Sequence, residues 1–226
     1  MKFRALLAVL ALAVIAIVTI PKPSDAAELV ALDDFGTTCL DATLDACVVQ
    51  SAGYLNSRDG APSIAFQVQT GSNEFDGIAA QVVLLVPEDD GWTVLANDSE
   101  GVAYSTPLLA DDTLLHVPGY QDGTASFNAD LLFQWNADDA TWHPIDLTTW
   151  EDTIAARLPK GLAIWKGVAY DFTSPWYALF ARTPLWQESD ANCCATGGSA
   201  EIEFSIVDDV LVADKVTFTP PPKTQP

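Results

Sequence analysis

The amino-acid sequence predicts an all-β protein, an antiparallel β-sandwich or barrel-like sheet of about ten to twelve strands with one short helix near residues 149–158. Three observations predict this class. Short apolar runs recur along the chain, separated by Gly, Asp, Asn and Pro. Residues 65–70 alternate apolar and polar side chains, as a half-buried strand does. Three segments, 82–95, 131–146 and 201–212, have the pattern of a strand, an acidic turn and a return strand. A small propeller remains an alternative, although the spacing of these hairpins is not constant.

The first 26 residues have the layout of a secretory signal peptide. Lys2 and Arg4 precede a run from Ala5 to Ile20 in which all residues but Thr19 are apolar. Two prolines and the small residues around Ala26 follow, which predicts cleavage after Ala26. The run is shorter than the roughly 20 apolar residues that a spanning helix needs. We therefore expect export to the periplasm or the exterior, with no membrane span after cleavage.

The remaining elements follow in chain order. Single strands are expected at 47–50, 113–117, 162–168, 177–182 and 215–219. Thr148 followed by Glu151 fits a capping box, and Trp150, Ile154 and Leu158 form one apolar helical stripe. Residues 27–218 are expected to form a single β domain. The Pro-rich residues 219–226 are expected to be a disordered tail.

The charge of the chain excludes some partners. Residues 1–26 hold three of the ten basic and one of the 31 acidic residues, which leaves a net charge of −23 on residues 27–226. Such a field repels polyanions, so we expect no nucleic-acid partner and no binding to anionic membranes.

Export places the four cysteines in an oxidising compartment, where they predict two disulfides. The sequence favours Cys39–Cys47 together with a bond between the adjacent Cys193 and Cys194. The alternative pairs each early cysteine with one of the late pair and so joins the two ends of the chain.

The C-terminal half is rich in tryptophan, and no common reaction motif occurs in the sequence. Exposed tryptophan beside Asp and Asn is a typical carbohydrate-binding pattern, whereas buried tryptophan is core packing. Trp176 follows a proline in a turn-like segment and is the strongest candidate for exposure. The candidate ligand-binding residues are Trp176, Tyr177, Trp186, Asp190 and Asn192.

Two further sets of polar residues have a structural and a functional interpretation. Asp122, Asn128 and Asp130 are weak candidates for a calcium site, because their loop lacks the regular spacing of a dedicated calcium loop. No cofactor is expected apart from calcium at that place. His116 and His143 lack ligand or triad spacing, so each is interpreted as a structural histidine.

One segment carries a resemblance. Trp186, Asp190 and Asn192 precede Cys193-Cys194 and then Thr196-Gly197-Gly198. This arrangement resembles uncharacterised exported bacterial proteins, in which proline is usual where this chain has Ala195. The resemblance covers most of the chain after the signal peptide. It implies a bacterial and periplasmic origin and no known activity.

The sequence thus favours a non-enzymatic binding module of the cell envelope, with a glycan or an envelope protein as ligand. A secreted hydrolase that uses paired carboxylates is the alternative from another class. A structural or inhibitor protein is the third.

Overall fold

The computed structural model describes residues 30, 32–41, 43–58, 60–73, 77–121 and 127–222. The predicted signal peptide, Asp122 and the last four residues lie outside this part of the chain. The described residues form antiparallel sheets with one short helix, so the predicted all-β class is confirmed.

The first sheet, which we call the N-terminal sheet, has the strand order β1-β2-β3-β4. It consists of β1 (Asp45–Leu55), β2 (Ile64–Ser72), β3 (Ala79–Glu88) and β4 (Gly91–Asp98). Neighbouring strands are antiparallel throughout. The hairpin predicted at 82–95 is the β3–β4 hairpin of this sheet.

The central sheet has the order β10-β9-β7-β6. Its strands are β6 (Leu108–Ala110), β7 (Leu114–Val117), β9 (Leu131–Asn136) and β10 (Thr141–Pro144). The C-terminal sheet has the order β12-β13-β15-β16 and consists of β12 (Ala169–Asp171), β13 (Leu179–Pro184), β15 (Ser199–Val207) and β16 (Val210–Thr219). The other two predicted hairpins are β9–β10 and β15–β16. Two small pairs complete the fold: β5 (Ala103–Tyr104) with β8 (Gly119–Tyr120), and β11 (Leu162–Ala163) with β14 (Trp186–Gln187).

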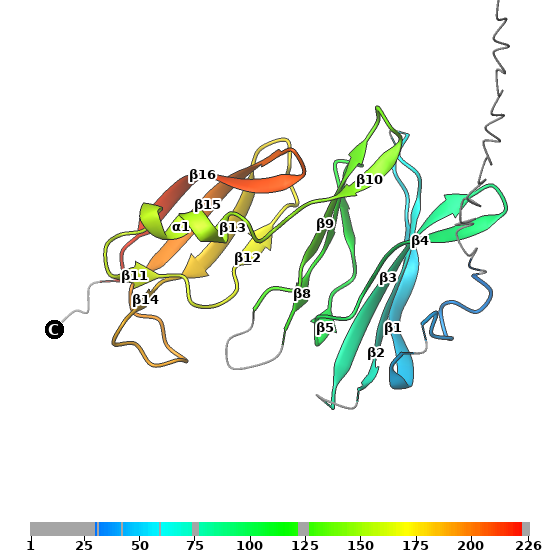
Figure 1. Cartoon of the computed structure of the whole chain (residues 1–226), viewed down its shortest axis with the longest axis horizontal. Coiled ribbons are helices and arrows are strands. Elements are labelled where there is room, and N and C mark those ends of the chain that lie inside the picture. Colours follow the sequence, from blue (N-terminus) through cyan, green and yellow to red (C-terminus); the bar gives the residue numbers. More distant parts are fainter. Residues whose placement is uncertain are drawn as a thin grey trace, which may run out of the picture.

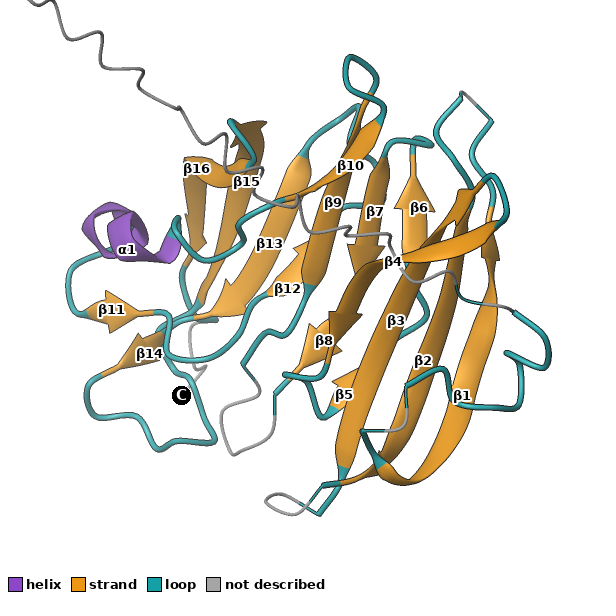
Figure 2. Ribbon diagram, turned by 45° about the vertical axis from the view of Figure 1, so that its right-hand side comes forward, coloured by secondary structure: helices purple, strands orange, loops and turns teal. Residues whose placement is uncertain are grey.

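The three larger sheets are arranged as successive layers (Figure 1, Figure 2). One core lies between the N-terminal and central sheets and contains Ile64, Leu84 and Leu115. A second core lies between the central and C-terminal sheets and contains Leu114 and Ile202. Adjacent residues of β7 thus enter different cores, because successive strand side chains point to opposite faces. The central sheet is buried on both sides.

The chain before β1 covers the outer face of the N-terminal sheet. Val30, Leu32 and Leu40 pack against a small core on that face. Buried Gln67 holds the segment, because its Oε1 accepts a hydrogen bond from the Leu40 backbone N at 2.8 Å. A disulfide between Cys39 and Cys47 ties the segment to β1.

The structure corrects the predicted architecture in four ways. The sheets do not close into a barrel. The described residues contain sixteen strands instead of ten to twelve, because several strands are only two or three residues long. Of the run predicted as a strand at 162–168, only Leu162–Ala163 is extended into a sheet, since the rest connects β11 to β12. Thr219, which the sequence analysis includes both in the expected strand at 215–219 and in the Pro-rich tail, is the last residue of β16.

The predicted helix is shorter than expected. It comprises α1 (Glu151–Ile154) and a 3-10 turn at Ala155–Arg157. Trp150 and Ile154 are buried as predicted, whereas Leu158 is only partly buried. The predicted capping box is wrong, since no side chain caps the helix. Instead Asp146 accepts hydrogen bonds from the backbone N of Thr148 and Thr149 and from both hydroxyls, which shapes the turn before the helix.

Candidate functional site

A tight turn just before β13 exposes Trp176 and Tyr177. The turn spans Ser174 to Tyr177, and the backbone N of Tyr177 donates to the Ser174 carbonyl at 2.9 Å. Proline is favoured at the second position of such a turn, where Pro175 stands. Trp176 is 68% and Tyr177 80% exposed.

The approach to this turn is also fixed by hydrogen bonds. The Asp171 carboxylate accepts hydrogen bonds from the Thr173 hydroxyl at 2.7 Å and from the Thr173 backbone N at 3.2 Å. These bonds hold the pKa of Asp171 below its usual range. Because the backbone on both sides of Trp176 is fixed, the two aromatic side chains are held out in water by the fold.

Trp176 and Tyr177 line a groove of about 540 Å³, which we call the Trp176 groove. Its walls come from the β6–β7 turn, β9, the turn before β13, β15 and β16, so it lies where the central and C-terminal sheets meet. Its polar lining residues are Asp111, Thr113, Gln134, Glu203, Ser205 and Asp214.

The polar groups of the Trp176 groove are mostly acceptors. Glu203 forms an ion pair with Lys215, and this hydrogen bond raises the pKa of the Lys215 ammonium. Asp214 accepts a hydrogen bond from the Ser205 hydroxyl at 3.2 Å. Gln134 is exposed and contributes an amide that can both donate and accept. The groove therefore combines two aromatic rings with groups that can bind hydroxyls.

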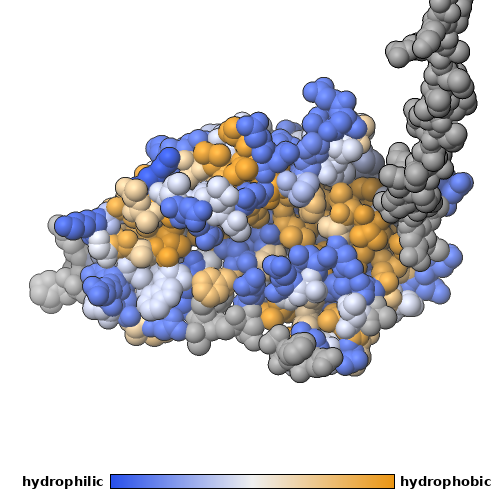
Figure 3. Space-filling model, in the orientation of Figure 1, coloured by the Kyte–Doolittle hydropathy of each residue, from blue (hydrophilic) through white to orange (hydrophobic). Residues whose placement is uncertain are grey.

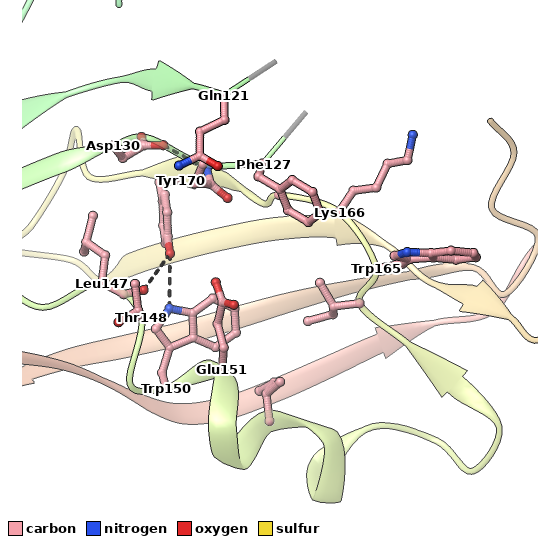
Figure 4. Close-up of a pocket in the computed structure, with 14 residues that line it drawn as sticks. Gln121, Phe127, Asp130, Leu147, Thr148, Trp150, Glu151, Trp165, Lys166 and Tyr170 are labelled. Atoms are coloured by element: carbon pink, nitrogen blue, oxygen red, sulfur yellow. Dashed lines mark hydrogen bonds between the residues drawn. The ribbon is translucent and has the colours of Figure 1, made fainter. Parts of the chain in front are cut away.

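A second hollow, which we call the Glu151 cavity, lies beside α1 (Figure 4). Its volume is about 370 Å³. Aromatic and aliphatic side chains form most of its wall: Phe127, Leu147, Trp150, Ile154, Ile164, Trp165 and Tyr170. An adjoining hollow lined by Phe127, Ile164 and Trp165 continues toward Trp186.

Most polar groups around the Glu151 cavity are already bonded to one another. The Trp150 indole N donates to the Tyr170 hydroxyl at 3.1 Å, and that hydroxyl donates to the Leu147 carbonyl at 3.2 Å. Asp130 accepts from Asn128 at 2.8 Å and pairs with buried His116 at 2.7 Å. These hydrogen bonds hold the side chains that line the Glu151 cavity in fixed positions.

The five candidate ligand-binding residues do not form one site. Trp176 and Tyr177 precede β13 and Trp186 follows it, so a six-residue strand separates them by about 20 Å. Trp186 is buried, with 5% of its surface exposed, and is part of β14.

Asp190 and Asn192 belong to the exposed loop that carries the bond between Cys193 and Cys194. The Asp190 carboxylate accepts hydrogen bonds from Thr196 Oγ1 at 2.6 Å and from the backbone N of Gln187 and Thr196 at 2.8 Å each. These bonds lower the pKa of Asp190, the Thr196 hydroxyl having the largest effect. Asp190 therefore shapes the loop.

The weak calcium candidates are engaged in packing where the structure describes them. Asn128 exchanges two hydrogen bonds with the backbone of Val168, at 2.8 and 2.7 Å, which ties the chain before β9 to the chain before β12. Asp130 pairs with His116, as described above. Asp122 lies outside the described residues. Within the described part of the chain, no group of three or more His, Cys, Asp or Glu side chains could hold a metal ion.

Several residues of the two hollows were not singled out by the sequence. Trp165 is 49% exposed, although it lies in a run that the sequence predicts as a strand. Gln134 and Asp214 reach the Trp176 groove from β9 and β16, two strands far apart in the sequence. No local pattern indicates such a meeting, because it depends on how the sheets stack.

The face of the molecule seen in Figure 3 is mixed in polarity. Figure 3 shows hydrophilic side chains over much of the visible face, interrupted by separate hydrophobic patches. Among the described residues, the one helix is neither long nor apolar enough to cross a membrane. Comparison of the chain with protein-family models, curated proteins and solved structures finds no match.

Proposed function

We propose that this chain is a non-enzymatic binding module of the cell envelope and that it holds a glycan in the Trp176 groove. The observation that carries the proposal is the pair of adjacent aromatic side chains, 68% and 80% exposed, at the edge of a groove with several hydrogen-bond acceptors. Export and envelope localisation belong to the same proposal and rest on the sequence of residues 1–26.

The physical reason is the unfavourable hydration of large aromatic surfaces. A Trp or Tyr side chain can bury 150–250 Å², so a fold that fixes two of them in water leaves apolar area that a ligand could cover. A pyranose ring offers a flat apolar face to an indole and hydroxyls to the groups around it. Asp111, Gln134 and Asp214 supply partners for such hydroxyls. An envelope protein, the other proposed ligand, would need a broader contact of about 800 Å² on each partner.

Screening residues 27–226 on a glycan array, followed by calorimetric titration of any glycan found, tests the proposal. We expect Trp176→Ala to weaken binding roughly tenfold, because stacking and buried area are both lost. Trp165→Ala is the matched control, since Trp165 is also half-exposed but lies at the Glu151 cavity. Wild-type affinity in the Trp176 variant, or an array without binding, would overturn the proposal.

The same titration separates binding from hydrolysis. The Trp176 groove contains the carboxylates of Asp111, Glu203 and Asp214, and a hydrolase of the paired-carboxylate type would cleave the bound glycan. Release of new reducing ends during prolonged incubation would identify the chain as a hydrolase instead. A stable complex with intact glycan is the expected result.

A further inference from the structure

We propose that the Glu151 cavity is a second binding site, and that it takes a small organic cation, an ammonium group carried on a short hydrocarbon stem. The site lies apart from the Trp176 groove, with which it shares no lining residue. Its volume of about 370 Å³ falls in the range of small-molecule sites.

The Glu151 carboxylate has no hydrogen-bond or ion-pair partner among the described residues, unlike most polar groups of the cavity. The Tyr170 hydroxyl and Trp150 indole are bonded to each other, and both oxygens of Asp130 have partners. The Thr148 hydroxyl donates to Asp146 at 2.8 Å. Among the described residues, by contrast, no hydrogen bond or ion pair ends on the Glu151 carboxylate. A ligand entering the cavity would therefore meet a carboxylate that lacks a cation.

Aromatic and aliphatic side chains form the wall of the Glu151 cavity. Phe127 and Trp165 are each nearly half-exposed and lie along one side of the hollow (Figure 4), which Ile164 also lines. Aromatic faces attract cations through their quadrupole, and they cover hydrocarbon equally well. A carboxylate beside aromatic and aliphatic surface matches a ligand that is both cationic and apolar.

The charged groups near the Glu151 cavity favour a cationic ligand. Lys166 lines the cavity, but its ammonium lies 6.0 Å from the centre of the Trp186 ring, and Figure 4 shows its side chain extending away from Glu151. The neighbouring Asp152 adds negative charge. Partial desolvation by the surrounding residues raises the pKa of the Glu151 carboxyl, although the residue as a whole is exposed, and the like charge of Asp152 raises it further. A bound cation would lower this pKa and so offset both effects. The strongly negative chain also favours the approach of a cation.

Titration of residues 27–226 with choline, followed by tryptophan fluorescence and calorimetry, tests this inference. We expect saturable binding that Glu151→Gln weakens roughly tenfold or more, because a charge-assisted contact is lost. Asp152→Asn is the matched control: it removes a neighbouring exposed carboxylate that does not line the cavity, and it should leave the affinity within about twofold. Glu151 is exposed, so its replacement should not impair folding, which circular dichroism will show.

The neutral isostere of choline, with carbon in place of the ammonium nitrogen, provides the second arm and should not bind measurably. Equal binding of this isostere, equal effects of Glu151→Gln and Asp152→Asn, or no saturation with choline would each overturn the inference. Trp176→Ala should leave choline binding unchanged. This result would show that the two sites are independent, whereas loss of choline binding in that variant would contradict the assignment to the Glu151 cavity.

Discussion

His143 joins two hairpin turns that are far apart in the sequence. Its Nε2 lies 2.8 Å from an oxygen of Asp139 in the β9–β10 turn, and its Nδ1 lies 3.0 Å from an oxygen of Asp209 in the β15–β16 turn. The bond to Asp209, followed by that to Asp139, raises the pKa of His143 above its usual 6.5. The protonated ring can donate to both carboxylates at once. The sequence interpretation of His143 as a structural residue agrees with this arrangement.

The raised pKa predicts how stability depends on pH. The folded state binds the His143 proton more tightly than the unfolded state does, so the contribution to stability is complete below about pH 6.5. It is lost as the pH rises through the higher pKa of the folded state. Urea unfolding at several pH values from 6 to 9 should show a free energy of unfolding that falls over this range, and His143→Gln should reduce the fall.

Asp208→Asn is the control for this experiment, since Asp208 lies beside Asp209 in the same turn and, within the described part of the chain, forms no ion pair with His143. An unchanged pH slope in the His143 variant would show that the two turns are not coupled through this ring.

Individual residues of the candidate site also show what could be predicted from the sequence and what could not. Exposure of Trp176 could be predicted because Pro175 gives a local reason for a turn. Burial of Trp186 could not, since a two-residue strand and its partner β11 give almost no local pattern. The loop role of Asp190 depends on Thr196, six residues further along the chain. Whether a polar side chain already has a hydrogen-bond partner depends on tertiary contacts, which no local sequence pattern indicates.

At the scale of elements, the two disulfides have different consequences. The bond between Cys39 and Cys47 closes a loop of about nine residues, and the chain-entropy relation gives it about 2.5 kcal/mol of stabilisation. The bond between Cys193 and Cys194 joins adjacent residues and closes no comparable loop of chain. Its two sulfurs sit in an exposed loop outside the cores.

Thermal unfolding of two double variants tests this difference. We expect Cys39→Ser with Cys47→Ser to lower the Tm by about 5–10 °C, the shift that about 2.5 kcal/mol produces in a chain of this size. Cys193→Ser with Cys194→Ser should change the Tm by much less. Similar losses in both variants would mean that the late pair restrains more of the fold than its loop.

Among the elements, those with a strong local pattern could be predicted and the others could not. The three hairpins can be predicted from the sequence because an acidic turn separates the two apolar strands of each. The run at 162–168 is apolar because Ile164 and Trp165 line the hollows beside α1, not because it pairs in a sheet. The predicted helix is longer than the observed one because the apolar stripe of Trp150, Ile154 and Leu158 continues past the α-helix, where the chain forms a 3-10 turn. Strands of two residues, such as β5 and β8, depend on tertiary pairing alone.

At the scale of the whole molecule, the central sheet connects the two hydrophobic cores, because it contributes side chains to both. Leu114, 2% exposed, packs in the core shared with the C-terminal sheet, and Leu115, fully buried, packs in the core shared with the N-terminal sheet. A strand buried on both faces loses the alternation of apolar and polar residues, which is why β7 is apolar at every position except His116. The layer order of the sheets could not be predicted from that pattern.

Because one strand serves both cores, the described sheets should unfold together. Leu114→Ala and Leu115→Ala should each destabilise the protein by about 2–5 kcal/mol, the usual cost of removing a buried leucine side chain. In calorimetry each variant should lower the midpoint of one common transition, because neither core can lose its shared wall alone. Val94→Ala, at a position 47% exposed, is the control and should change stability by no more than about 0.5 kcal/mol. Two separate transitions, with each leucine variant shifting a different one, would show instead that the layers fold as independent units and that the central sheet belongs to only one of them.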